Sequence, residues 1–117
     1  MKRAHALQDL SREHHEALVL ARRACATAAD PHGLDVQAHR AHLLERWAEQ
    51  FAPHFELEEQ TLLPALERAG LHEPVATALA QHACLREMIE RVRQGDVLAL
   101  APWGDAMAIH VRFEERT

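Results

Sequence analysis

Two copies of the spacing His-x-x-x-Glu are present in the sequence: His54 with Glu58, and His110 with Glu114. In an α-helix, residues four apart lie one turn along and about 40° apart around the axis, so each pair points from one face. Such a pair can hold a cation between an imidazole nitrogen and a carboxylate oxygen. Nitrogen and oxygen donors without a thiolate suit iron or manganese, so the two motifs predict a metal site of that kind.

The two motifs belong to an internal repeat. Residues 54–61 align without a gap on residues 110–117, and the His, both residues of the Glu-Glu pair and the final Thr are identical. The first copy continues into Leu62-Leu-Pro-Ala-Leu66, whereas the second ends at Thr117 in the middle of the pattern. We therefore expect a single domain over residues 1–117 that is truncated within its last helix.

The elements that must position these residues are helices. The chain has 117 residues, of which 22 are Ala and 16 are Leu, side chains that lose little freedom in a helix. Gly and Pro divide it into four segments, at about 5–29, 35–69, 74–94 and 102 to the end. Short connections favour antiparallel neighbours, so the predicted fold is all-α, an up-down-up-down antiparallel four-helix bundle. Pro53 lies inside the second segment and is expected to kink it.

The apolar stripe of each segment is interrupted by polar residues at helical spacing. In the second segment the stripe runs through Leu44, Trp47 and Phe51 and continues to Leu62 and Ala65. Every segment places one His on its inward face, and two add a Glu one turn later. The resulting candidate metal ligands are His14, His54, Glu58, His82, His110 and Glu114. His15 is the alternative to His14.

Charge and cysteine usage narrow the setting of the protein. The net charge is -5 and no stretch is dense in Lys or Arg, which argues against a nucleic-acid partner. Cys25 and Cys84 form no Cys-x-x-Cys motif, so both are expected to be buried, reduced thiols. The longest uncharged run, residues 74–85, is shorter than the roughly 20 residues that span a bilayer. We therefore expect a cytoplasmic protein without a membrane partner.

Taken together, these motifs resemble the hemerythrin-like, His-His-Glu (HHE) cation-binding domain family. The resemblance is carried, in chain order, by Leu10-Ser-Arg-Glu-His14, the block from Phe51 to Pro64, Gln81-His82, and His110-Val-Arg-Phe-Glu114-Glu115. It implies two iron ions joined by an oxo or hydroxo bridge in the bundle core, with zinc or manganese as alternatives. By that resemblance, His14 and His54 would serve one iron, His82 and His110 the other, and Glu58 and Glu114 would bridge them.

The sequence departs from the oxygen-carrying members of that family at two positions. Those proteins place a second His one turn after the third-helix His, where this chain has Arg86. They also carry an Asp five residues after the fourth-helix His, where Glu115 stands as an alternative bridge. One imidazole fewer leaves a coordination position open. We therefore expect binding or sensing of dioxygen, nitric oxide or peroxide, with a di-iron peroxidase or oxidase, or an iron-handling module with a mainly structural metal, as alternatives.

Overall fold

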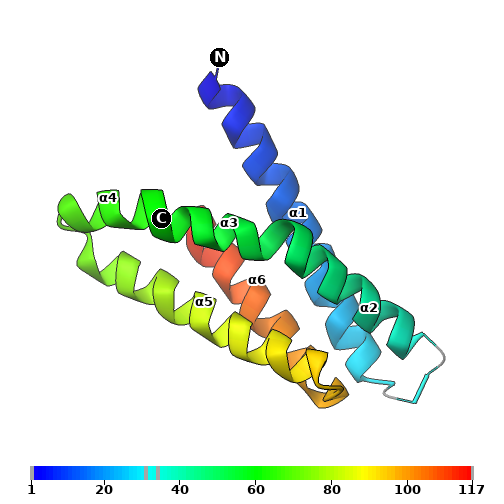
Figure 1. Ribbon diagram of the computed structural model, residues 1–117. Helices are drawn as coiled ribbons and strands as arrows, with labels where there is room; N and C mark the ends of the chain where they lie inside the picture. The colour runs from blue at the N-terminus through cyan, green and yellow to red at the C-terminus, as the bar shows by residue number, and fades with distance from the viewer. Residues whose placement is uncertain (1, 31, 34, 117) are drawn as a thin grey trace.

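The computed structural model describes residues 2–30, 32–33 and 35–116, with side chains from residue 12 onward. These residues form helices joined by turns (Figure 1): α1 (Lys2–Ala28), α2 (Val36–Arg46), η1 (Trp47–Phe51), α3 (Ala52–Leu57), η2 (Glu58–Leu62), α4 (Leu63–Arg68), α5 (His72–Arg93), η3 (Val97–Ala99) and α6 (Leu100–Arg116). The stretch from α2 to α4 is one continuous helical segment, so the predicted four-helix, all-α bundle is confirmed. None of the described helices combines the length and the apolar character needed to cross a membrane.

Glycine ends two of the four helical segments, as the sequence predicts. Gly70 and Gly95 follow α4 and α5 with φ angles of 87° and 98°, a left-handed conformation that costs glycine little. The amide of Asp96 donates to the carbonyl of Arg91 at 3.0 Å, the long bond that closes a Schellman turn. The chain reverses within a few residues at each point, which sets neighbouring segments antiparallel.

The second segment contains two π-helical turns, η1 and η2, and a proline follows each of them, Pro53 and Pro64. A proline lacks the amide hydrogen that would continue the α-helical bonding pattern, and a wider turn just before it accommodates that loss. Figure 1 shows the segment changing direction between α3 and α2, in agreement with the kink predicted at Pro53.

The π-turns also correct the predicted apolar stripe. A π-turn holds one residue more than an α-turn, so every residue after it is rotated by about one position. Glu58 and the next buried residue, Leu63, are therefore five positions apart, with η2 between them. The prediction that Leu62 and Ala65 face the core is wrong: Leu62 is 48% exposed and Ala65 is exposed. In α2, Leu43 is fully buried and Leu44 is only partly buried; Leu43 lies four residues before the buried Trp47, an ordinary α-helical spacing.

The core joins all four segments. Its largest fully buried apolar side chains are Trp103, Leu43, Leu85, Leu100, Met107, Val92 and Val111. α6 packs closely on α1 because Gly104 has no side chain: a Cβ added there would lie 2.6 Å from the carbonyl oxygen of Ala21. α6 also contacts α5, and α5 contacts α4. This arrangement brings the midpoints of the four segments together.

The prediction that both cysteines are buried is wrong. Cys84 is exposed, because the buried positions of α5 are His82 and Leu85 and residue 84 points away from both. Cys25 is partly exposed in the groove between α1 and α6, with its Sγ 3.8 Å from the carbonyl oxygen of Ala101. Both cysteines are free thiols.

Candidate metal centre

The six predicted ligands meet in the interior of the bundle. His82 and His110 are almost completely buried, and His14 is 9% exposed. The side chains of the other three, His54, Glu58 and Glu114, are also largely shielded from solvent, at 22%, 11% and 17% exposure. The alternative His15 is exposed, because it lies about 100° around α1 from His14. The structure thus places His14 and not His15 at the centre.

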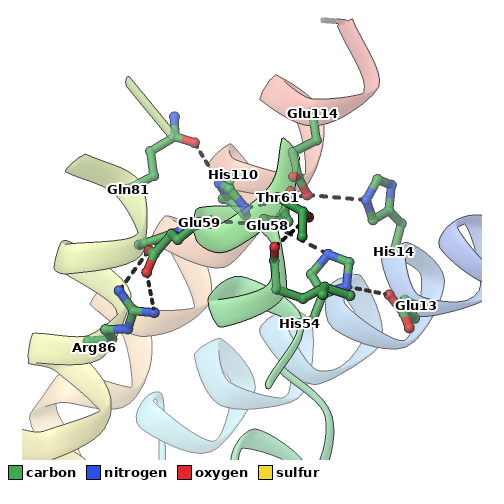
Figure 2. Close-up of polar contacts among 12 residues, drawn as sticks. Glu13, His14, His54, Glu58, Glu59, Thr61, Gln81, Arg86, His110 and Glu114 are labelled. Atoms are coloured by element: carbon green, nitrogen blue, oxygen red, sulfur yellow. Dashed lines mark hydrogen bonds and ion pairs between the residues drawn. The ribbon is translucent and has the colours of Figure 1, made fainter. Parts of the chain in front are cut away.

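Each carboxylate lies between imidazoles from two different helices. Figure 2 shows Glu114 facing His14 of α1. Glu58 Oε1 is 3.3 Å from His54 Nε2 and 3.5 Å from His82 Nε2. Glu114 Oε1 is 3.4 Å from His14 Nε2 and 3.4 Å from His110 Nε2. All four imidazoles therefore turn the same ring nitrogen, Nε2, towards the two carboxylates.

Most of these inward atoms have no hydrogen-bond partner. In the part of the chain that the structure describes, six buried side-chain nitrogen or oxygen atoms lack one, and four of the six belong to the site: His14 Nε2, Glu58 Oε1, His82 Nε2 and His110 Nε2. A buried polar atom without a partner costs about 1 to 3 kcal/mol, so such a cluster calls for an explanation. A cation that accepts lone pairs from all of them satisfies the whole set.

The spacing of the donor atoms also suits metal ions. Two groups of three residues each offer one ligand atom within 4.8 Å of the others: Glu58, His82 and His110, and His54, Glu58 and Glu114. Glu58 belongs to both groups. The residues present therefore fit the metal centre that the sequence predicts, with imidazole and carboxylate donors and no thiolate.

The outward ring nitrogens, Nδ1, are held by a second set of residues that the sequence analysis missed. The pairs are His82 with Glu59 Oε2 at 2.7 Å, His110 with Gln81 Oε1 at 2.7 Å, His54 with Glu13 Oε2 at 3.0 Å, and His14 with Glu115 Oε1 at 3.5 Å. An Nδ1–H that faces an oxygen acceptor leaves the lone pair on Nε2, the form of imidazole that binds a metal.

These outer partners follow a rule around the bundle. Each is the direct sequence neighbour of an inward residue on its own segment, and it holds the His of the next segment in chain order. Thus Glu13 on α1 contacts His54, and Glu59 on the second segment contacts His82. Gln81 on α5 contacts His110, and Glu115 on α6 returns to the His of α1. The sequence signal was available in the Glu-His, Glu-Glu and Gln-His dipeptides, but their partners lie on other helices.

Arg86 belongs to this outer layer. Its two terminal nitrogens donate to the two carboxylate oxygens of Glu59, at 2.8 and 3.0 Å. Burial raises the pKa of the Glu59 carboxyl, but the bonds from Arg86 and His82 outweigh it and bring that pKa below its usual value. Figure 2 shows the guanidinium of Arg86 against the carboxylate of Glu59. The side chain that replaces a second imidazole on α5 therefore holds the anion that orients His82.

The pKa values of Glu114, His14 and His54 are shifted towards the charged forms of these groups. Burial raises the pKa of the Glu114 carboxyl, but the imidazoles of His110 and His14 outweigh that effect and bring the pKa well below its ordinary value. The Glu114 carboxylate raises the pKa of His14, and the Glu58 carboxylate raises that of His54, against an opposing effect of burial.

An aromatic wall closes one side of the site. The ring of Phe55 stacks on His82, with 4.1 Å between centroids and 13° between planes, and meets the edge of His110 at 5.1 Å. Trp47 packs edge-on against Phe55 at 5.6 Å. Trp47 and Phe51 are buried, as predicted, and the ring in direct contact with the imidazoles is that of Phe55. This wall keeps the inward nitrogens away from bulk water on that side.

Comparison with known proteins gives one match. The family model described as "Hemerythrin HHE cation binding domain" matches residues 5–117, nearly the whole chain. Neither the curated proteins nor the solved structures contain a match to this chain.

Proposed function

The chain belongs to the hemerythrin HHE cation-binding domain family, and from this premise we propose that it is a non-haem di-iron protein that binds or senses dioxygen, nitric oxide or peroxide. The observation that supports this proposal best is the convergence of four imidazole Nε2 atoms on two buried carboxylates. A bound pair of iron ions supplies redox-active coordination positions for a small ligand. Zinc would use the same donors without that redox chemistry, and manganese would use them with less of it.

The grouping of the donor atoms supports one division of the ligands, because His82 and His110 lie in one group with Glu58 and His54 lies in the other. If His14 and His54 serve one iron and His82 and His110 the other, each carboxylate has an oxygen within 3.5 Å of an imidazole from both pairs. Glu58 and Glu114 are therefore suited to bridge the two ions. Glu115 is a weaker candidate for a bridge, because it is exposed and contacts the outward nitrogen of His14.

The residues around the ligands prepare the site for cations. Acceptors at Nδ1 hold each ring in one tautomer, and the wall of Phe55 and Trp47 excludes water from one side. Arg86 is engaged with Glu59 and does not point at the centre. The ligand set proposed here therefore has four imidazoles, and it favours binding or sensing of a small ligand over reversible oxygen carriage.

Metal analysis of protein purified from iron-supplemented cells tests the centre. We expect about two iron ions per chain and the ultraviolet-visible bands of an oxo- or hydroxo-bridged ferric pair. His14→Ala should lower the iron content, whereas His15→Ala, at the exposed neighbouring position, should not. Fewer than one metal ion per chain, without such bands, would refute the proposal. Full occupancy by zinc would refute the di-iron assignment.

The choice of small ligand needs a separate experiment. After anaerobic reduction, titration with dioxygen and then with nitric oxide should give saturable optical changes. The same changes should be absent in Glu58→Ala, which removes the carboxylate shared by both groups of donor atoms. Many turnovers of hydrogen peroxide with a reductant, lost in the same variant, would instead identify a di-iron peroxidase.

A further inference from the structure

The outward ring nitrogens of the candidate centre face acceptors of unequal charge. Nδ1 of His110 lies 2.7 Å from Oε1 of Gln81, an uncharged amide. Nδ1 of His54 instead faces the carboxylate of Glu13 at 3.0 Å. Figure 2 shows both contacts. In the described part of the chain the other two imidazoles also face carboxylates, so the partner of His110 differs from the rest.

The guanidinium of Arg86 removes the charge difference at a second imidazole. Nδ1 of His82 lies 2.7 Å from Oε2 of Glu59, and Arg86 donates to both oxygens of that carboxylate. The Glu59 carboxylate and the Arg86 guanidinium together carry no net charge. The outer layer that holds the imidazoles of α5 and α6 is therefore neutral as a whole.

The other two imidazoles have a negative outer layer. Glu13 faces His54 at 3.0 Å, and Glu115 faces His14 at 3.5 Å. None of the ion pairs found among the described residues joins Glu13 or Glu115 to a Lys or an Arg. Two carboxylates therefore act on these two imidazoles without the compensation that Arg86 gives to Glu59.

The proposed division of the ligands places the two outer layers on different ions. We call His14 and His54 the α1/α3 pair, and His82 and His110 the α5/α6 pair. A carboxylate that accepts a hydrogen bond from Nδ1 makes an imidazole a stronger donor, and its charge stabilises a more highly charged metal ion. This effect favours ferric iron at the α1/α3 pair.

Burial acts in the same direction. The side chains of His82 and His110 are 0% and 1% exposed, whereas those of His14 and His54 are 11% and 22% exposed. A more highly charged ion loses more hydration energy where the surroundings are more deeply buried. The neutral outer layer and the deeper burial therefore both favour ferrous iron at the α5/α6 pair.

We propose that Gln81 and Arg86 make the two metal positions unlike, so that the α5/α6 pair keeps its iron ferrous at potentials where the α1/α3 pair already holds ferric iron. A one-electron oxidant such as ferricyanide then removes the first electron at the α1/α3 pair and is itself reduced to ferrocyanide. This inference rests on the proposed function, because it needs two iron ions divided between the two pairs.

Two substitutions of equal size form a matched test. Gln81→Glu adds a negative charge at His110, and Glu13→Gln removes one at His54. Each variant keeps an oxygen that can accept from Nδ1, so the hydrogen bond is retained and only the charge changes. Arg86→Gln is a third variant, which leaves the charge of Glu59 uncompensated beside His82. Circular dichroism and the iron content per chain establish that each variant is folded and loaded.

The measurement is a potentiometric titration of the reduced, iron-loaded full chain, with Mössbauer spectra to count ferrous and ferric ions at each stage. We expect two one-electron steps and one ion of each state between them. Gln81→Glu and Arg86→Gln should lower the midpoint of the second step, and Glu13→Gln should raise that of the first. Each change should be about tenfold in the equilibrium constant for oxidation, or about 59 mV for one electron.

Several results would overturn the assignment. A single two-electron step in the unmodified protein would show that the two positions are alike. A main effect of Gln81→Glu on the first step, or of Glu13→Gln on the second, would reverse the order of the positions. Constants within twofold of the unmodified protein in all three loaded variants would show that the outer charges do not act. Fewer than two iron ions per chain in the unmodified protein would instead refute the proposed function, and this inference with it.

Discussion

Glu59 offers the sharpest test of how the outer layer supports the centre. It accepts a hydrogen bond from Nδ1 of His82 at 2.7 Å and two from Arg86, at 2.8 and 3.0 Å. His82 is completely buried, and Glu59→Ala removes the acceptor that its Nδ1–H faces. The variant leaves a buried N–H unpaired and frees the ring to rotate or to adopt the other tautomer. We therefore expect a lower affinity for divalent metal with an unchanged number of sites.

The size of the effect follows from the lost bond. A buried donor without a partner costs about 1 to 3 kcal/mol, and about 1.4 kcal/mol corresponds to a tenfold change in a binding constant. The dissociation constant for Mn²⁺ should therefore rise about tenfold to a hundredfold in Glu59→Ala, the range typical of residues that orient metal ligands. Glu59→Gln retains an acceptor oxygen for His82 but loses the charge and one bond to Arg86, so its effect should be smaller.

The assay is a competition titration of Mn²⁺ between the protein and a chelator of known affinity. Glu56→Ala is the matched control, because Glu56 is an exposed glutamate one turn earlier in the same segment. An affinity of Glu59→Ala within twofold of the unmodified protein would refute the argument. An equal loss in Glu56→Ala would show that the effect is one of net charge and not of orientation.

Three further predictions concern stability. The raised pKa values of His14 and His54 stabilise the metal-free fold below their ordinary value of 6.5, and this contribution is lost as the pH rises through the raised values. The lowered pKa of Glu114 contributes stability above 4.5 that is lost on acidification. The Tm of the metal-free protein should therefore fall from pH 6 to pH 8. The affinity for metal should rise over the same interval, because the ligands must be deprotonated to bind it. A Tm and a metal affinity that change in the same direction would contradict this prediction. If the free metal concentration is a thousandfold above Kd before a chelator is added, removal of the metal should lower Tm by at least about 10 °C. An unchanged Tm would show that the metal does not bind the native state in preference to the unfolded state. Gly104→Ala should cost about 1 to 3 kcal/mol in urea denaturation, because its Cβ would lie 2.6 Å from a carbonyl oxygen of α1, and a cost below about 0.5 kcal/mol would show that α6 can shift freely.

Local periodicity was sufficient to predict the fold and the six inward His and Glu residues. Gly70 and Gly95 mark helix ends because a residue in the left-handed conformation ends the helix that directly precedes it. His54 and Glu58 share a face because an α-helix repeats every 3.6 residues, whatever packs against it. The choice of His14 over His15 likewise required only the phase of one apolar stripe. These features depend on neighbours within about one or two helical turns, which the sequence contains directly.

Contacts between helices could not be predicted in this way. The extra residue in η2 moved Leu63 into the core in place of Leu62, and that rotation follows from backbone bonding that the stripe does not encode. The carboxylate of Glu59 faces His82 only because the second segment and α5 pack at one particular rotation. The sequence alone thus determined the four helical segments and the six His and Glu side chains that face inward. Only the tertiary structure decided which atoms of different helices meet, because the relative rotation and translation of the helices are set by the packing of the whole core.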